Sequence, residues 1–591
     1  MSEPHRLLIA RMSSDLAAIS AYTNRVSADL GELHRLLDQA PVPVTSAPSV
    51  PFVVPTSSTV APGPVPAPAP RRERSEGWIG KALAVAGVTV TLTGVVLLLV
   101  LAAQAGILRP EFRIAAGAVL GAGLVAVGWW IYRRPGGRVG AIALAATGVA
   151  AAYMDVIAVT TIYDWVSAPV GLALAAAIGG GGLMLARRWN SERLGLLVLV
   201  PLIALAPVVT DGVTLLLIGF MLALSAAALP VQFGRDWLWL YAARTAAATL
   251  PLLIALASTS IDGRHDLVLA LTCGLAATLA LVGGVLVLRW TTRPAATAVL
   301  AAGGVLPVLC VVAAVDRVIA ALMAAALAAA LVAIVAIGDR VPGLSVVVRQ
   351  VWSVLAAVAA LVSVLVAFDG PVAGPLLLAM ATVVAVAVAR RGGDVPRWIA
   401  VGLAMVGGVI CLDSAGPGTL IHATKLSAGL TVSVLIGSVL AIAAAAAISW
   451  AWSVGDEADE EVVRLVWVAA AVVAGYAVTG FTVTAGVVIG GTGAGFFGGH
   501  MAATICWIAV AAGLLGFAAR RPRTERSLPI GGGMALVVAA MVKLFLFDLG
   551  TLDGMFRVAV FIVVGLALLG MGARYARLLN QQDQGTGRQS M

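Results

Sequence analysis

The sequence predicts an all-α protein, a polytopic transmembrane helical bundle of about eighteen spans with an N-terminal cytoplasmic coiled-coil helix. Hydrophobic residues make up 61% of the 591 residues and charged residues only 11%, whereas soluble domains average about 45–50% and about 25%. The apolar residues come in stretches of about 20, the length of helix that crosses a hydrocarbon layer about 30 Å thick. Only short loops separate these stretches, so any site must be built from helix faces and short loops.

The sequence pattern of residues 1–40 predicts a single helix. Its seam positions follow an alternating spacing of three and four residues, and all but Thr23 are apolar: Ile9, Met12, Leu16, Ile19, Thr23, Val26, Leu30, Leu33 and Leu37. Such a seam is typical of a coiled coil, so we expect residues 1–40 to bind a protein partner or a second copy of the chain. An amphipathic helix lying on the membrane surface is the alternative.

Three further segments complete the expected organisation. Residues 41–77 form a disordered, Pro-rich linker, because prolines recur throughout Pro41–Pro70 and no core can form there. Residues 78–577 form the multi-span membrane domain. Residues 578–591 are expected to be a disordered cytoplasmic tail.

The expected spans follow one another along the membrane domain. In chain order they are Leu83–Ala103, Ile114–Ile131, Val139–Val159, Pro169–Ala186, Leu194–Val209, Gly212–Val231, Trp237–Ala257, Leu267–Leu288, Ala295–Val315, Val318–Ile337, Val351–Phe368, Val372–Ala389, Trp398–Leu412, Leu426–Ser449, Leu465–Val487, Met501–Ala519, Ile530–Phe547 and Phe556–Gly572. Leu194–Val209 contains two prolines and Trp398–Leu412 is short, so a re-entrant segment is the alternative for each.

Basic residues concentrate in every second loop. If the N-terminus lies in the cytoplasm, the loops assigned to that side hold most of the 38 Lys and Arg residues. The positive-inside rule then predicts that both termini lie in the cytoplasm. Because arginine far outnumbers lysine, as in GC-rich bacteria, we expect a bacterial cytoplasmic (inner) membrane protein. The net charge of +9 lies beside apolar spans, so the expected partner is the lipid bilayer and not nucleic acid.

No pattern in the sequence predicts a cofactor, a metal ion or a catalytic residue. The four cysteines show no metal-binding spacing. Gly493, Gly495 and Gly498 form a GxGxxG pattern, but it lies between two spans and not after a β-strand. We expect this glycine run to allow close backbone approach or a re-entrant loop, and Gly117 and Gly121 to allow close helix packing.

Ionisable residues in or beside the spans form the candidate polar site, because charges in hydrocarbon cost free energy. The candidates are Lys543, Asp548, Asp553, Arg557, Glu111, Arg113, Asp155 and Arg244. Lys543, Asp155 and Arg244 lie close enough to span ends to extend to the interface, or to join an interhelical pair. Asp553 and Arg557 are spaced to pair on one helical face, and Asp553 also suits a helix N-cap.

The tail Lys543-Leu-Phe-Leu-Phe-Asp548-Leu-Gly-Thr-Leu-Asp553-Gly-Met-Phe-Arg557 resembles the C-terminal signature of a bacterial family of predicted membrane proteins, the domain of unknown function 2339. Trp78-Ile-Gly80, Arg113 and the loop Tyr163–Pro169 are similar to that family too. The resemblance implies a coiled coil, a Pro-rich linker and many spans. It implies no activity and no residue roles.

Three functions fit the sequence. Envelope-related transport of a small molecule or a lipid fits the many spans and the charges within them. A membrane scaffold that recruits partners through residues 1–40 is the second. A lipid-carrier-dependent enzyme using an outer carboxylate such as Glu111 or Asp553 is the least favoured, because no long outer loop is expected, and an enzymatic role is less favoured than a non-enzymatic one.

Overall fold

A computed structural model describes residues 109–262, 266–340, 342–454, 460–518, 520, 527–545, 555 and 558–570. Several expectations lie outside the described residues. These are the coiled coil 1–40, the linker 41–77, the first span Leu83–Ala103, the tail 578–591, and the site residues Asp548, Asp553 and Arg557.

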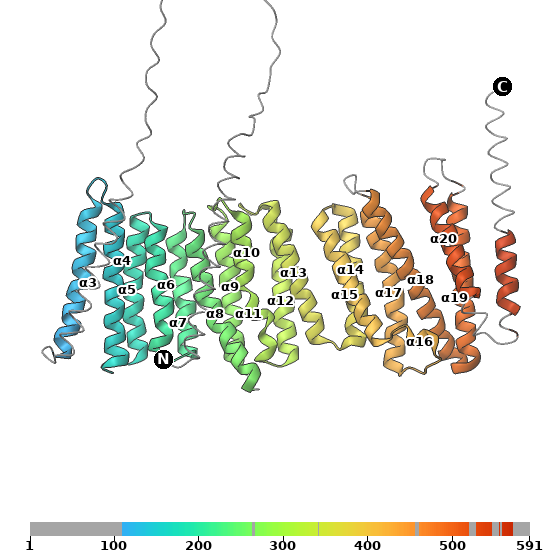
Figure 1. Ribbon diagram of the computed structural model, residues 1–591, viewed down its shortest axis with the longest axis horizontal. Coiled ribbons are helices and arrows are strands. Elements are labelled where there is room, and N and C mark those ends of the chain that lie inside the picture. Colours follow the sequence, from blue (N-terminus) through green and yellow to red (C-terminus); the bar gives the residue numbers. More distant parts are fainter. Residues whose placement is uncertain are drawn as a thin grey trace, which may run out of the picture. The chain divides into compact units, whose positions relative to one another are not determined.

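The described residues are helical, with no strand among them, and most helices run beside their neighbours in the chain (Figure 1). The α-helices are α3 Pro110–Tyr132, α4 Arg138–Ile157, α5 Ala168–Arg188, α6 Glu192–Val209, α7 Leu215–Ala228, α8 Leu238–Asp262, α9 Leu267–Val287, α10 Pro294–Gly304, α11 Leu306–Leu309, α12 Arg317–Ala336, α13 Val346–Ala367, α14 Gly370–Arg391, α15 Asp394–Ser414, α16 Gly418–Ile421, α17 Ala428–Ser453, α18 Glu460–Gly490, α19 Phe496–Ala518, α20 Ser527–Lys543 and a last helix, Val558–Gly570. The π-helices are η1 Ala158–Ile162 and η5 Gly491–Gly495, and the 3₁₀ turns are η2 Leu229–Gln232, η3 Val311–Ala313 and η4 Gly338–Arg340.

The helices begin where the sequence supplies a cap. The side chains of Ser191, Thr214, Asp266, Ser345 and Ser427 each accept a hydrogen bond from a backbone N–H in the first turn of the following helix. Proline stands at one of the first two positions of α3, α5, α10 and α14, where its missing N–H removes no intrahelical bond. Polar caps therefore separate one apolar helix from the next.

Thirteen helical stretches in the described residues are long and apolar enough to cross a membrane, so the chain is a multi-pass membrane protein. One of them, Glu460–Ala518, is 59 residues long and contains α18, η5 and α19. Pro294–Gly304, Ile530–Lys543 and Val558–Gly570 are apolar but shorter.

The two spans that the sequence marked as weak are continuous helices. Helix α6 passes through Pro201 and Pro207 without a break, and α15 extends over 21 residues. By contrast, the expected span Ala295–Val315 is interrupted: α10 ends at Gly304, and only the short α11 and η3 follow. The paired glycines before the break and Pro307 after it weaken a continuous helix at this point.

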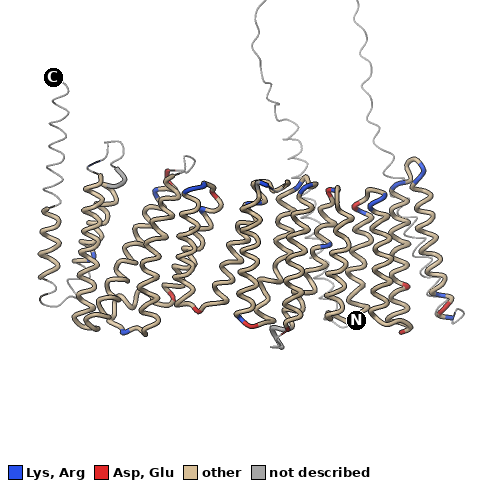
Figure 2. The backbone as a smooth tube through the Cα atoms, turned by 180° about the vertical axis from the view of Figure 1, so that it is seen from behind, with Lys and Arg blue, Asp and Glu red and all other residues tan. Residues whose placement is uncertain are grey.

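Hydrogen bonds join four loops at one end of the helices. Arg138, which follows α3, donates to the carbonyl oxygen of Trp189 at 3.0 Å, and Arg235 donates to that of Arg187 at 3.1 Å. Thr291 donates to Asp236 at 3.0 Å. These contacts join the loops α3–α4, α5–α6, η2–α8 and α9–α10, all of which the alternation of basic loops assigns to one side. Figure 2 shows most Lys and Arg residues of the described chain at this end.

Glycines bring neighbouring helices into close contact where the sequence predicted it. A Cβ at Gly121 would lie 3.0 Å from the carbonyl oxygen of Gly148 across the α3–α4 contact. In the Gly490–Gly499 run, a Cβ at Gly495 would lie 2.2 Å from the carbonyl oxygen of Gly486, so α18 and α19 form a tight hairpin around η5. The expectation of close backbone approach is confirmed at both places.

Candidate functional site

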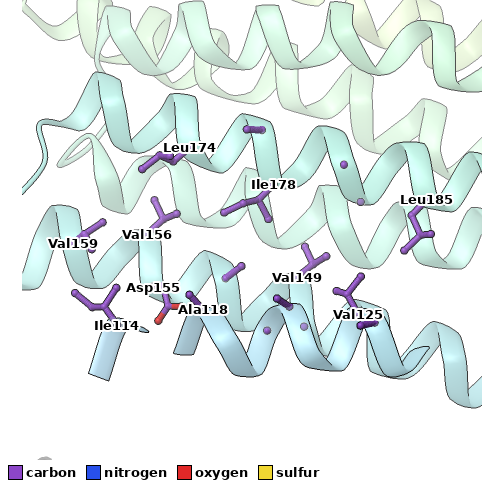
Figure 3. A pocket seen from close by; sticks show the side chains of 18 of the residues that line it. Ile114, Ala118, Val125, Val149, Asp155, Val156, Val159, Leu174, Ile178 and Leu185 are labelled. Atoms are coloured by element: carbon purple, nitrogen blue, oxygen red, sulfur yellow. The ribbon is translucent and has the colours of Figure 1, made fainter. Parts of the chain in front are cut away.

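An apolar groove lies between α3, α4 and α5, with a volume of about 810 Å³. Figure 3 shows that side chains of all three helices line it. Its lining residues are Ile114, Ala118, Gly121, Ala122, Val125, Ala126, Trp129, Gly148, Val149, Ala152, Asp155, Val156, Val159, Leu174, Ala177, Ile178, Gly181, Gly182 and Leu185. Asp155 is the one ionisable residue in that lining, so the groove combines an apolar surface with a single carboxylate.

Asp155 lies near the end of α4, and its carboxylate packs against α3 close to Ile114 and Ala118 (Figure 3). A Cβ at Gly117 would lie 2.2 Å from Oδ1, so any other residue there would require the carboxylate to move. The Oδ2 atom is buried and accepts no hydrogen bond from the described residues. The charge that the sequence placed near the end of a span therefore lies at the groove, and Gly117 lets it lie between two helices.

The other two candidates on α3 lie at its beginning. Glu111 is exposed in the first turn, and Arg113 is half-buried one turn before Gly117. Because residues four apart share a helix face, Arg113 and Gly117 lie on the same side of α3. No ion pair between Arg113 and Asp155 is present among those of the described residues.

Lys543 joins α20 to α19. Its ammonium group donates to the Thr504 hydroxyl at 2.8 Å and to the carbonyl oxygen of His500 at 3.2 Å. His500 Nε2 lies 2.9 Å from the carbonyl oxygen of Leu420, and its ring packs edge-on against Phe496. The sequence left two alternatives for Lys543, extension to the membrane interface or pairing between helices. The structure shows hydrogen bonds between helices.

His500 and Thr504 are residues that the sequence reasoning did not single out. They lie four apart on α19, both almost completely buried. A histidine inside an apolar helix is itself the signal that was available, because ionisable residues in spans are uncommon and costly. Their pairing with Lys543 depends on how α19 and α20 pack, which sequence spacing does not give.

Arg244 is buried within the helices and does not extend to an interface. Only 1% of its surface is exposed. Its Nη1 atom donates to the carbonyl oxygen of Ser225 at 3.4 Å, and its guanidinium carbon lies 4.9 Å from the centre of the Tyr241 ring. A small cavity adjoins it between α7, α8 and α9.

The described candidates have separate surroundings. Asp155 contacts α3, Arg244 contacts α7 and α9, and Lys543 contacts α19. Within the residues that the structure describes, no group of three His, Cys, Asp or Glu side chains is arranged to hold a metal ion. The chemistry available at these places is therefore hydrogen bonding and charge, each in an apolar setting.

Comparison with known proteins gives one match. Searches among curated proteins and among solved structures found no similar chain. Residues 80–400 and 371–578 match a family described as "Predicted membrane protein (DUF2339)". These matches extend over most of the sequence, including the groove, Arg244 and the tail from Lys543 to Arg557. The chain therefore belongs to this family of predicted membrane proteins.

Proposed function

We propose that this protein binds a membrane amphiphile in the α3–α4–α5 groove and transports it within the bacterial cell envelope. The observation that carries the proposal is the groove itself, about 810 Å³ in volume and lined by apolar side chains and the single carboxylate of Asp155. Its size is within the range of about 300–1,000 Å³ that is usual for small-molecule sites.

The lining indicates the chemical class of the ligand. Alanine, glycine and valine side chains on three helices suit a hydrocarbon chain, which needs contact area and no hydrogen bonds. A buried carboxylate oxygen needs donors, because an unpaired charge in hydrocarbon is costly. An amphiphile with an acyl chain and an amine- or hydroxyl-bearing head offers both apolar contact area and hydrogen-bond donors.

The proposal includes a topology. We place eighteen spans in the cytoplasmic membrane, with both termini in the cytoplasm and with residues 1–40 available for self-association or a protein partner. The loops that carry Arg134 and Arg391 would face the cytoplasm, and those after Asp413 and at His422 the outside. The hydrogen-bonded basic loops support this assignment, since a shared end of the helices is what the alternation requires.

The amphiphile is tested by native mass spectrometry of the protein released from gentle detergent. We expect the wild type to retain one enriched lipid class. Ala122→Trp fills the groove and should lose that lipid. Val127→Trp changes an exposed position on the same helix that does not line the groove, and should keep it.

Asp155→Asn tests the role of the carboxylate. We expect it to retain lipid but to lose the preference for the amine- or hydroxyl-bearing head, because an amide no longer attracts a cationic donor.

In the lipid-retention test, equal retention by Ala122→Trp and the wild type would refute the proposal.

Single cysteines in a chain without its four native cysteines test the topology. Cysteines at Arg134 and Arg391 should react with an impermeant thiol reagent only after the membrane is opened. Cysteines at Asp413 and His422 should react in intact cells. The opposite pattern would overturn the orientation, and a mixed pattern would overturn the count of spans.

A further inference from the structure

Arg244 is a buried cation in an apolar part of the protein. It lies in the second turn of α8, about 9 Å from the start of the helix at Leu238. With 1% of its surface exposed, its guanidinium group is enclosed by the surrounding helices. A charge in this position is costly unless an opposite charge accompanies it.

The described residues supply no such charge. Neither of their ion pairs includes Arg244. Its Nη1 atom has the Ser225 carbonyl oxygen at 3.4 Å, but Nε and Nη2 are buried without a hydrogen-bond partner in the described part of the chain. Three N–H groups of a full positive charge, one on Nε and two on Nη2, therefore lack acceptors among the described residues.

A cavity of about 10 Å³ lies beside these donors, bounded by Ser225 on α7, by Thr245 and Thr249 on α8 and by Ala276 on α9. That volume is enough for one occupant of about the size of a water molecule. Carboxylates, phosphate and sulfate are too large for it. The volume of the cavity limits the occupant to one small ion or molecule, and the positive charge of Arg244 favours an anion.

We propose that this cavity binds one halide ion, chloride in the cell, as the counter-ion of Arg244. A water molecule would accept the hydrogen bonds but leave the charge unbalanced, whereas a halide does both. The site is separate from the α3–α4–α5 groove and does not depend on the function proposed for it.

Two variants on α9 provide a matched test. A Cβ at Gly283 would lie 2.8 Å from Nη2, so Gly283→Ala displaces the guanidinium group. A Cβ at Gly274 would make only an ordinary contact, 3.6 Å from the Met323 methyl group, so Gly274→Ala is the control. Arg244→Met removes the charge and puts an unbranched apolar side chain in its place.

The experiment measures thermal unfolding of the purified full chain in detergent, in chloride, in fluoride and in gluconate at equal ionic strength, together with binding of radioactive chloride. We expect chloride or fluoride to raise the Tm of the wild type and of Gly274→Ala by roughly 2 °C or more over gluconate. Arg244→Met should lose this shift and the bound chloride, and Gly283→Ala should weaken both.

Equal Tm values of the wild type in chloride, fluoride and gluconate would overturn the proposal, as would an undiminished halide shift in Arg244→Met. If Arg244→Met fails to fold, the wild type and the two glycine variants decide. Chloride binding that is the same in Gly283→Ala and Gly274→Ala would then place the ion elsewhere and contradict the site.

Discussion

At the scale of single residues, the close contact between Gly117 and Asp155 determines how α3 meets α4. Any side chain at position 117 would overlap the carboxylate, because its Cβ atom would lie 2.2 Å from Oδ1. Glycine at this position costs helix propensity, since alanine is favoured by about 1 kcal/mol in a free helix. An alanine would gain that propensity only if the Asp155 carboxylate moved aside.

Gly117→Ala should therefore destabilise the protein by about 1–3 kcal/mol, the usual cost of overpacking. Gly123→Ala is the control, because a Cβ there meets no other atom within 4 Å, and it should be neutral or slightly stabilising. Thermal unfolding in detergent measures both. Equal behaviour of the two variants would show that α3 does not lie against Asp155.

Lys543 and Thr504 form a direct hydrogen bond between α20 and α19, at 2.8 Å. Interhelical hydrogen bonds in membrane proteins contribute about 0.6 kcal/mol on average and up to about 1.7 kcal/mol. A double-mutant cycle with Lys543→Met and Thr504→Val should give a coupling free energy in that range. A coupling of zero would mean that the two side chains do not interact in the folded protein.

At the scale of elements, the α18–η5–α19 hairpin depends on glycine at the points where backbones touch. A Cβ at Gly495 would lie 2.2 Å from the carbonyl oxygen of Gly486 and 2.6 Å from the carbonyl carbon of Gly490. Backbone atoms cannot move aside as a flexible side chain can. The hairpin must open or bend if any side chain is added.

Gly495→Ala should cost about 1–3 kcal/mol of unfolding free energy. Gly493→Ala lies in the same π-helix, with no atom within 4 Å of its added Cβ, and should leave stability nearly unchanged. Denaturation in detergent micelles compares the two. If Gly493→Ala were the more damaging change, the backbone contact between Gly495 and Gly486 would not exist in the folded protein.

Asp236 connects the η2–α8 and α9–α10 loops outside the spans. Desolvation raises its pKa, but hydrogen bonds from Thr292 and Thr291 and the charge of Arg293 outweigh that effect, so the pKa is lowered overall. A carboxyl group with a lowered folded-state pKa stabilises fully above its ordinary value of about 3.9 and loses that effect as the pH falls through the folded pKa.

Asp236→Asn should therefore lower stability at neutral pH, by less than about 1 kcal/mol because the group is mostly exposed. The deficit should shrink as the pH falls below about 4. Asp413→Asn, at an exposed position, is the control. Tm values measured between pH 3 and pH 7 test this, and a constant deficit over that range would contradict the assigned pKa direction.

At the scale of the whole molecule, the apolar stretches predicted most of the described helices. Helices α6 and α15 follow the apolar stretches despite two internal prolines in one and a short apolar stretch in the other. The break after α10 escaped prediction, because hydropathy does not register a backbone weakened by glycine and proline. Hydrophobicity determines where a chain crosses the bilayer, and local backbone preference determines whether the helix is continuous.

The candidate site could be predicted only in part. Asp155 and Lys543 stand out in the sequence as charges inside apolar stretches. Their surroundings do not, because Gly117 and Thr504 reach them only through the packing of separate helices. The burial of Arg244 was also beyond the sequence, since its distance from the helix end suits either an interfacial or an inward-facing side chain.

The central claim is that the α3–α4–α5 groove binds an amphiphile selectively. The most direct test places a leucine-sized photoreactive amino acid in cells at Leu174, which lines the groove, and identifies its adducts by mass spectrometry. Leu271, 73% exposed on α9, is the control position. We expect position 174 to capture one lipid class that is enriched over the adducts at position 271, with the enrichment lost in Asp155→Asn. Adducts at position 174 in the same proportions as at position 271, or an adduct with residues 83–103 of the same chain, would contradict the claim.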